Sequence, residues 1–139
     1  KKIQSELAHF QYSTLASKAQ QVGPSSILIS ELNGFDGNTL QSAASELTKK
    51  LGSNSAVVLA GVPNDSKKLL FVASFGSDLI QMGMHAGKFI NNVARMCNGG
   101  GGGKPSLAQA GAKDIKKLNE AFKYAESELI TQLNNYSDK

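Results

Sequence analysis

The chain is short of the residues that build disulfides, metal centres and membrane spans. With one cysteine and two histidines in 139 residues, it cannot form an internal disulfide or the usual four-ligand cysteine–histidine zinc site. No apolar run approaches the roughly 20 residues that would span a bilayer. These scarcities exclude a disulfide-stapled scaffold, a zinc finger and a membrane protein.

The composition that remains is that of one soluble globular domain. Apolar residues make up 40% of the chain and charged residues 19%, which fits a folded domain and not a disordered one. The length suits one domain with a short appendage. The chain begins Lys-Lys-Ile-Gln, with no methionine and no apolar segment behind the charges, which predicts a fragment or processed product without a signal peptide.

Hydrophobic periodicity predicts an α/β fold, with a small mixed β-sheet flanked by helices. Apolar, β-branched runs indicate at least three strands, over residues 26–32, 56–60 and 69–73. A helix over 40–51, ended by Gly52, joins the first two strands and implies a parallel crossover. The short turn between the second and third strands predicts that these two are antiparallel.

Further helices are predicted in the middle and at both ends of the chain. Apolar residues at helical spacing indicate a helix over 1–22, so we expect a helical linker over 1–24 and a globular domain over 25–139. Another helix is predicted over 84–97. Asp114 is expected to cap the last helix. The buried stripe of that helix comprises Ile115, Leu118, Phe122, Ala125, Leu129, Leu133 and Tyr136.

The excess positive charge lies in about a quarter of the chain. Residues 81–117 carry six basic side chains and one acid, a net charge of +5, while the rest of the chain nets −1. A basic patch suits a polyanionic partner, because Lys and Arg release counterions when they neutralise phosphates. A solvated lysine-rich surface is the alternative, and charge alone does not separate the two.

Five consecutive glycines, Gly99–Gly103, are the feature that most needs a reason, because such a run is costly to order. One reason is close approach of the backbone to a ligand, with N–H groups that cup a phosphate. The other is a flexible loop. The flanking Arg95 and Lys104 favour the first. The run is not a nucleotide P-loop, because Asn98 and Pro105 stand where that motif needs a glycine and a hydroxyl.

No constellation of side chains points to catalysis. His85 begins a predicted helix, but the sequence ties no carboxylate or nucleophile to it. Cys97 falls on the apolar face of that helix, where packing is a more common role than nucleophilic attack. We therefore predict no catalytic residue and no metal-binding residue in this chain.

The glycine run continues as Lys104-Pro105-Ser106-Leu107-Ala108-Gln109-Ala110-Gly111. A glycine run followed by a basic residue, proline, two variable residues and Ala-Gln-Ala-Gly strongly resembles the signature of the C-terminal (C-Ala) domain of alanyl-tRNA synthetases. The order of elements over about residues 26–135 is also similar. Related domains on DHH-type phosphoesterases carry a histidine where this chain has Lys104-Pro105.

This resemblance implies a non-catalytic tRNA-binding module whose parent is an alanine–tRNA ligase. In that family the domain holds the outer corner, or elbow, of alanine-specific tRNA and helps to couple aminoacylation to editing. The implied partners are tRNA and the remaining domains of the parent, which would use ATP, magnesium and zinc, whereas this chain would bind no cofactor. The helix before residue 25 resembles the family's linker, which in some members forms a homodimer. The implied location is the cytoplasm, or mitochondria for a mitochondrial form.

Functions of different classes stay open at this stage. A DNA-binding module would present the same charge, because DNA and tRNA are both read through phosphate. A protein-interaction module and a phosphoesterase-type substrate-binding domain also fit the sequence. A competition between tRNA and duplex DNA at fixed salt separates these classes.

The predicted nucleic-acid surface combines one helix face, the glycine run and the residues that follow it. Three of its members share a helix face, and Lys104 is expected to return near Arg95. Gln109 is included as a sugar or base-edge contact, with bracing of the loop from inside as its second role. The full set is Lys88, Asn92, Arg95, Gly99, Gly100, Gly101, Gly102, Gly103, Lys104, Gln109, Lys113, Lys116 and Lys117.

Overall fold

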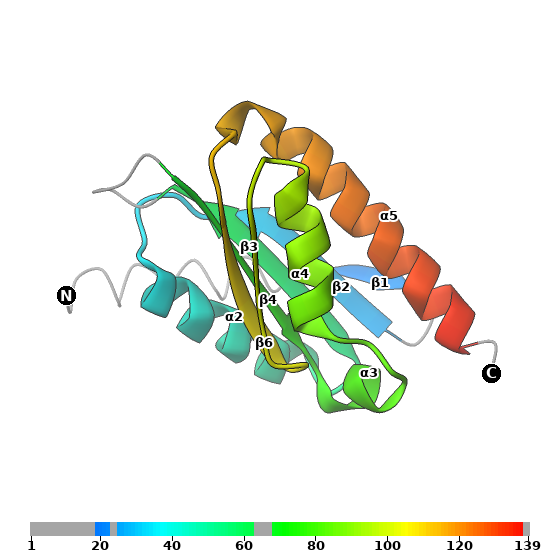
Figure 1. Cartoon of the computed structure of the whole chain (residues 1–139). Helices are drawn as coiled ribbons and strands as arrows, with labels where there is room; N and C mark the ends of the chain where they lie inside the picture. The colour runs from blue at the N-terminus through cyan, green and yellow to red at the C-terminus, as the bar shows by residue number, and fades with distance from the viewer. Residues whose placement is uncertain (1–18, 23–24, 63–67, 138–139) are drawn as a thin grey trace.

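The computed structural model describes residues 19–22, 25–62 and 68–137 as one mixed sheet with helices on both faces (Figure 1). The first 18 residues of the helix predicted over 1–22, and the turn over 63–66, lie outside the described residues. The elements, in chain order, are β1 (Gln20–Val22), β2 (Ser25–Glu31), α2 (Gly37–Leu51), β3 (Ser55–Gly61), β4 (Leu69–Phe75), α3 (Ser77–Gln81), α4 (Ala86–Arg95), β5 (Gly100–Gly103), β6 (Leu107–Ala112), the 3₁₀ turn η1 (Ile115–Lys117) and α5 (Leu118–Ser137).

The six strands lie in the order β1-β2-β3-β4-β6-β5. Strands β2 and β3 are parallel, as the helix between them predicted, and β3 and β4 are antiparallel. Strands β4, β6 and β5 continue the sheet with antiparallel pairing. The predicted α/β class and the three predicted strands are therefore confirmed, while β1, β5 and β6 were not predicted.

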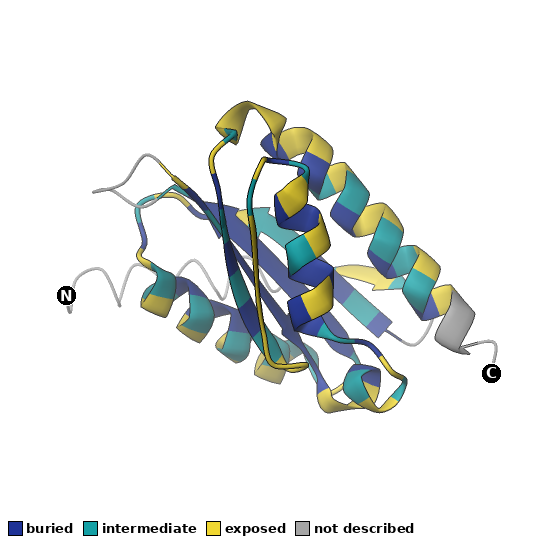
Figure 2. Ribbon diagram, viewed as in Figure 1, coloured by how far each residue is buried: buried dark blue, intermediate teal, exposed yellow. Residues whose placement is uncertain are grey.

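Each face of the sheet has its own apolar core. One core lies under α4 and α5, where Ala56, Val58 and Phe71 are fully buried. The other lies under α2, where Val57 and Leu59 meet the buried residues of that helix. Because successive strand residues point to opposite faces and both faces are covered, every residue of β3 is buried (Figure 2).

Local signals in the sequence fix both ends of α2. The Asp36 carboxylate accepts a hydrogen bond from the Thr39 N–H at 2.8 Å, which satisfies one of the free donors of the first turn. Gly52 ends the helix with a φ of 106°, and its N–H donates to the Thr48 carbonyl. The prediction that Gly52 ends this helix is confirmed.

Three details of the N-terminal and C-terminal predictions are wrong. Gln20–Val22 form the edge strand β1, paired with β2, and not the end of a helix. Asp114 precedes η1 without making a capping hydrogen bond, and Ile115 is 41% exposed instead of buried. The apolar spacing indicated an α-helix in both places. Strand pairing replaces it at the N-terminal site, and a tighter 3₁₀ turn replaces it at the C-terminal site. The division of the chain at residue 24 stays a prediction.

Candidate nucleic-acid interface

Helix α4 is amphipathic, with one apolar face and one polar face. Its buried residues include Phe89, Ile90 and Val93, whereas Lys88, Asn92 and Arg95 are exposed or partly exposed on the polar face, as their spacing predicted. His85 Nδ1 accepts a hydrogen bond from the Lys88 N–H at 3.2 Å. The histidine therefore caps the helix that carries the basic face.

The glycine run forms a strand and not a loop. Gly100–Gly103 pair antiparallel with β6, in the register Gly101↔Ala110, and make the last strand of the sheet beside α4 (Figure 1). The flexible-loop alternative is therefore wrong. The strand was not predicted because glycine carries no β-propensity signal, although its backbone pairs like that of any other residue.

Close packing explains three of the five glycines. A Cβ on Gly101 would lie 2.5 Å from the Gln109 carbonyl oxygen, and Cβ atoms on Gly99 and Gly103 would also overlap the β6 backbone. Gly100 and Gly102 differ: the nearest atoms to their Cβ positions are Asn91 Oδ1 at 3.0 Å and the Gly87 carbonyl oxygen at 4.0 Å, respectively. The fold thus requires glycine at alternate positions of the run, whereas a Cβ on Gly102 would meet no close neighbour.

Helix α4 uses backbone donors that the glycine run was predicted to offer to phosphate. The Gly99 N–H donates to the Ala94 carbonyl at 2.9 Å, and the Gly101 N–H donates to Asn91 Oδ1 at 3.2 Å. These two N–H groups do not form an open phosphate cup, so that part of the prediction was wrong. Asn91 was missed because nothing in its sequence position distinguishes it from other polar residues of a helix.

The same contacts show that β5 runs back along α4. Gly99 lies beside Ala94, Gly101 beside Asn91, and Gly103 beside Gly87. At the turn that follows, the Pro105 carbonyl accepts a hydrogen bond from the Ala86 N–H at 2.9 Å. Lys104 therefore lies at the amino end of α4, and the prediction that it returns near Arg95 was wrong.

The remaining basic residues gather at the other end of α4. The Cys97 carbonyl, just beyond the helix, accepts hydrogen bonds from the Lys113 N–H at 3.1 Å and the Asp114 N–H at 2.8 Å. Lys116 and Lys117 follow in η1. Lys68, which the sequence did not single out, precedes Leu69, the register partner of Ala112, and so belongs to this same end.

The basic side chains thus form two sets along one helix. We call Lys88 and Lys104 the amino-end pair. Arg95, Lys113, Lys116 and Lys117 form the carboxyl-end group. All six are exposed, and none of them makes an ion pair with another residue in the described part of the chain. Their charge is therefore available to an external anion.

Gln109 lies apart from this surface. Its neighbours Ala108 and Ala110 face α4, so Gln109 faces α2 on the opposite side of the sheet. There its Oε1 accepts a hydrogen bond from Gln41 Nε2. The bracing role is the one that this geometry favours.

The thiol of Cys97 is poorly placed for chemistry. It is fully buried, and burial raises its pKa, with a further rise from the nearby Asp114 carboxylate. A raised pKa keeps the group as a thiol, which is a weak nucleophile.

Within residues 19–22, 25–62 and 68–137, no group of three or more metal-ligating side chains is close enough to hold an ion. No helix in these ranges is long and apolar enough to cross a membrane.

Comparison with known proteins gives three concordant similarities. The DHHA1 domain family matches residues 25–131. Alanine–tRNA ligase of Prochlorococcus marinus subsp. pastoris is 59% identical over 139 residues, which is 99% of this chain and 16% of that protein. The same enzyme of P. marinus strain MIT 9515 is 55% identical over the same shares.

Among solved structures, the C-Ala domain from Aquifex aeolicus alanyl-tRNA synthetase has a TM-score of 0.68 at 25% identity. The alignment covers 83% of this chain and 96% of that domain. The chain spans about a sixth of the length of the curated relatives it matches, 16% in each case. The resemblance drawn from the glycine–lysine–proline signature is confirmed.

Proposed function

Because this chain belongs to the DHHA1 domain family, we propose that it is the non-catalytic, tRNA-binding C-Ala domain of an alanyl-tRNA synthetase. Its partners would be alanine-specific tRNA and the remaining domains of the parent enzyme. ATP, magnesium and zinc would serve those other domains and not this one. A cytoplasmic location goes with this proposal.

The observation that supports tRNA binding most directly is the basic surface along α4. Lys88 and Arg95 lie on either side of Asn92 on α4, a helix of ten residues, and the other members of the two basic sets lie beside the ends of that helix. Such a helix is about 15 Å long, so the two sets can contact phosphates of one strand that are separated by more than one nucleotide. Contacts of this kind set the position of a nucleic acid and supply most of its affinity.

The glycine strand has a steric role in this proposal. Residues 100–103 are exposed and carry no side chains, so no side chain protrudes from the surface beside α4 between the two basic sets. A sugar–phosphate backbone can then approach the exposed face of α4 without displacing anything. Gly102, which packing does not require, is the residue most directly explained by this approach.

Two finer roles extend the proposal. The domain would hold the outer corner of the tRNA, as the family resemblance implies, and would thereby help the parent enzyme to pass a mischarged tRNA from aminoacylation to editing. Both roles need a domain that binds away from the reactive end of the tRNA. The basic surface, as far as the structure describes it, holds no nucleophile–base pair. This suits a domain that binds tRNA while other domains of the parent enzyme carry out the catalysis.

A salt titration of tRNA binding tests the proposal. We expect Lys88→Ala with Arg95→Ala to weaken binding and to flatten the log–log dependence of affinity on salt by about 1 per lost contact. The matched control is Lys50→Ala with Lys123→Ala, which removes the same charge from exposed positions on α2 and α5. Duplex DNA serves as competitor.

Equal salt slopes and equal affinities in the two double variants would contradict the proposed surface. Stronger competition by duplex DNA than by unlabelled tRNA would favour the DNA-binding alternative. If the unmodified chain bound neither nucleic acid, a protein-interaction role would replace the proposal.

A further inference from the structure

A groove on the α2 side of the sheet belongs to none of the surfaces described so far. It is an open depression of about 460 Å³ between the last two turns of α2, the end of β4 and the start of β6. A second depression of about 410 Å³ shares Ser45 and Leu107 with it and continues along α2. The combined space is within the range of small-ligand sites.

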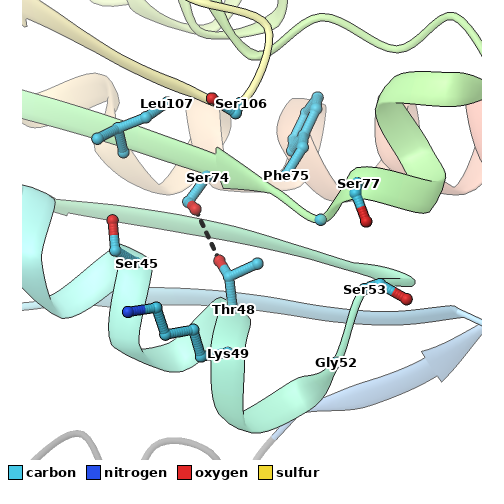
Figure 3. Close-up of a pocket in the computed structure, with 11 residues that line it drawn as sticks. Ser45, Thr48, Lys49, Gly52, Ser53, Ser74, Phe75, Ser77, Ser106 and Leu107 are labelled. Atoms are coloured by element: carbon cyan, nitrogen blue, oxygen red, sulfur yellow. Dashed lines mark hydrogen bonds between the residues drawn. The ribbon is translucent and has the colours of Figure 1, made fainter.

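Six of the eleven residues that line the first depression carry a hydroxyl group. Figure 3 shows the hydroxyls of Ser45, Thr48 and Ser74 turned toward the space between α2 and β4. The lining also includes one cation, Lys49, and three more serines, which are Ser53, Ser77 and Ser106. It is completed by Gly52, Phe75, Gly76 and Leu107. We call this set the hydroxyl groove.

Some of these hydroxyls hold the groove in shape and others are available to a ligand. Thr48 Oγ1 and Ser74 Oγ are hydrogen-bonded at 2.7 Å, and Ser53 Oγ donates to Asp78 Oδ2 at 2.8 Å. Within the described residues, the hydroxyls of Ser45 and Ser106 make no hydrogen bond, and Lys49 makes no ion pair. Each free hydroxyl offers one donor and two acceptor sites.

The groove adjoins the basic surface at the tip of the β5–β6 hairpin. Lys104 and Ser106 flank Pro105, whose carbonyl meets the start of α4, while the Ser106 carbonyl accepts a hydrogen bond from the Phe75 N–H at 2.9 Å. One side of the tip thus presents a lysine of the amino-end pair, and the other side presents a free serine of the groove. A single extended strand can contact both.

We propose that the hydroxyl groove binds a ribose–phosphate unit of the RNA and thereby makes the domain prefer RNA to DNA. Ser45 and Ser106 would hydrogen-bond the ribose 2′-OH, which both donates and accepts, and Lys49 would pair with the adjoining phosphate. This inference rests on the proposed function. It deepens that function because the basic surface contacts phosphate, which RNA and DNA share.

The test measures the affinities of an RNA hairpin and of its all-DNA counterpart at one salt concentration. We expect the unmodified chain to prefer the RNA by about three- to tenfold, as one or two hydrogen bonds would supply. Ser45→Ala with Ser106→Ala should abolish that preference and leave the DNA affinity unchanged. Ser127→Ala, an exposed serine on α5, is the control. A double variant that keeps the preference, or loses RNA and DNA affinity equally, would overturn the inference.

A direct probe separates failure of this inference from failure of the proposed function. Millimolar ribose 5-phosphate should shift the backbone NMR signals of Ser45, Lys49 and Ser106, and 2-deoxyribose 5-phosphate should shift them less. If the chain bound no RNA, the proposed function would fail, and this titration alone would decide whether the ribose–phosphate site exists. Equal shifts with inorganic phosphate would show an anion site only and would refute the ribose site.

Discussion

Strands β3 and β5 belong to one sheet and are held in it by opposite means. Every residue of β3 is buried, and its side chains fill the cores on both faces. Every residue of β5 is an exposed glycine, held by pairing with β6 and by the Gly101 N–H bond to Asn91. Burial of apolar surface thus stabilises the centre of the sheet, while backbone contact stabilises its edge.

This difference reverses the expected effect of substitution. In β3, removing side-chain atoms leaves a cavity, because the surroundings relax only in part. In β5, adding a single methyl group forces the strand away from β6 wherever the new Cβ would overlap the backbone. The edge next to the proposed interface is therefore sensitive to gain of volume and not to loss of it.

The largest effect should come from Leu59→Ala in β3. Leu59 is fully buried beneath α2, so the substitution should lower the free energy of unfolding by about 2–5 kcal/mol. Urea unfolding followed by circular dichroism measures this change. Ile115→Ala removes a similar side chain at an exposed position and should change stability little. An equal loss in both variants would mean that β3 does not owe its stability to burial.

An intermediate effect is expected from Gly101→Ala, with Gly102→Ala as its matched partner. The first substitution puts a Cβ 2.5 Å from the Gln109 carbonyl oxygen and should cost about 1–3 kcal/mol. At Gly102 nothing lies closer than 4.0 Å, and loss of chain freedom in the unfolded state can stabilise by up to about 1 kcal/mol.

The two glycine variants should also differ in which property they lose, stability or tRNA binding. We expect Gly102→Ala to keep its stability and yet to weaken tRNA binding, because the added methyl group raises the surface beside α4. If both variants unfolded at the same urea concentration, the packing account of alternate glycines would be wrong.

The smallest effect should come from Asn91→Ala. The change removes the acceptor of the 3.2 Å bond from the Gly101 N–H and should cost about 0.5–1.5 kcal/mol. Hydrogen exchange at Gly101 is the more sensitive measurement and should accelerate. Asn92→Ala, one residue further along α4 and exposed, is the control. Unchanged exchange at Gly101 would show that Asn91 does not anchor the edge strand.

Much of the sheet could be predicted because burial leaves a pattern in the sequence. The β-branched and apolar runs around Val57 and Phe71 indicate strands that are covered on both faces, and the spacing of Phe89, Ile90 and Val93 indicates the buried face of α4. The polar face of that helix then follows from helical geometry. These signals depend only on local periodicity.

The path of the chain after α4 could not be predicted, because it leaves no local periodicity in the sequence. Glycine has no side chain whose pattern could reveal a strand, so nothing in the run itself indicates β5. The position of Lys104 depends on the direction in which that strand runs, and this direction is set by contacts with α4 that are remote in sequence. The groove combines residues of α2, β4 and the hairpin tip, which no single segment of sequence brings together.

The contact between Gly87 and Gly103 fixes how stiffly the basic surface is presented. A Cβ on Gly87 would lie 2.8 Å from the Gly103 carbonyl oxygen, so helix and strand touch backbone to backbone with no rotatable side chain between them. The backbone should then move little on binding, and the entropic cost of ordering the protein should fall on the exposed lysine and arginine side chains. The domain would select a nucleic acid by the shape that its phosphates already have, as a rigid template does.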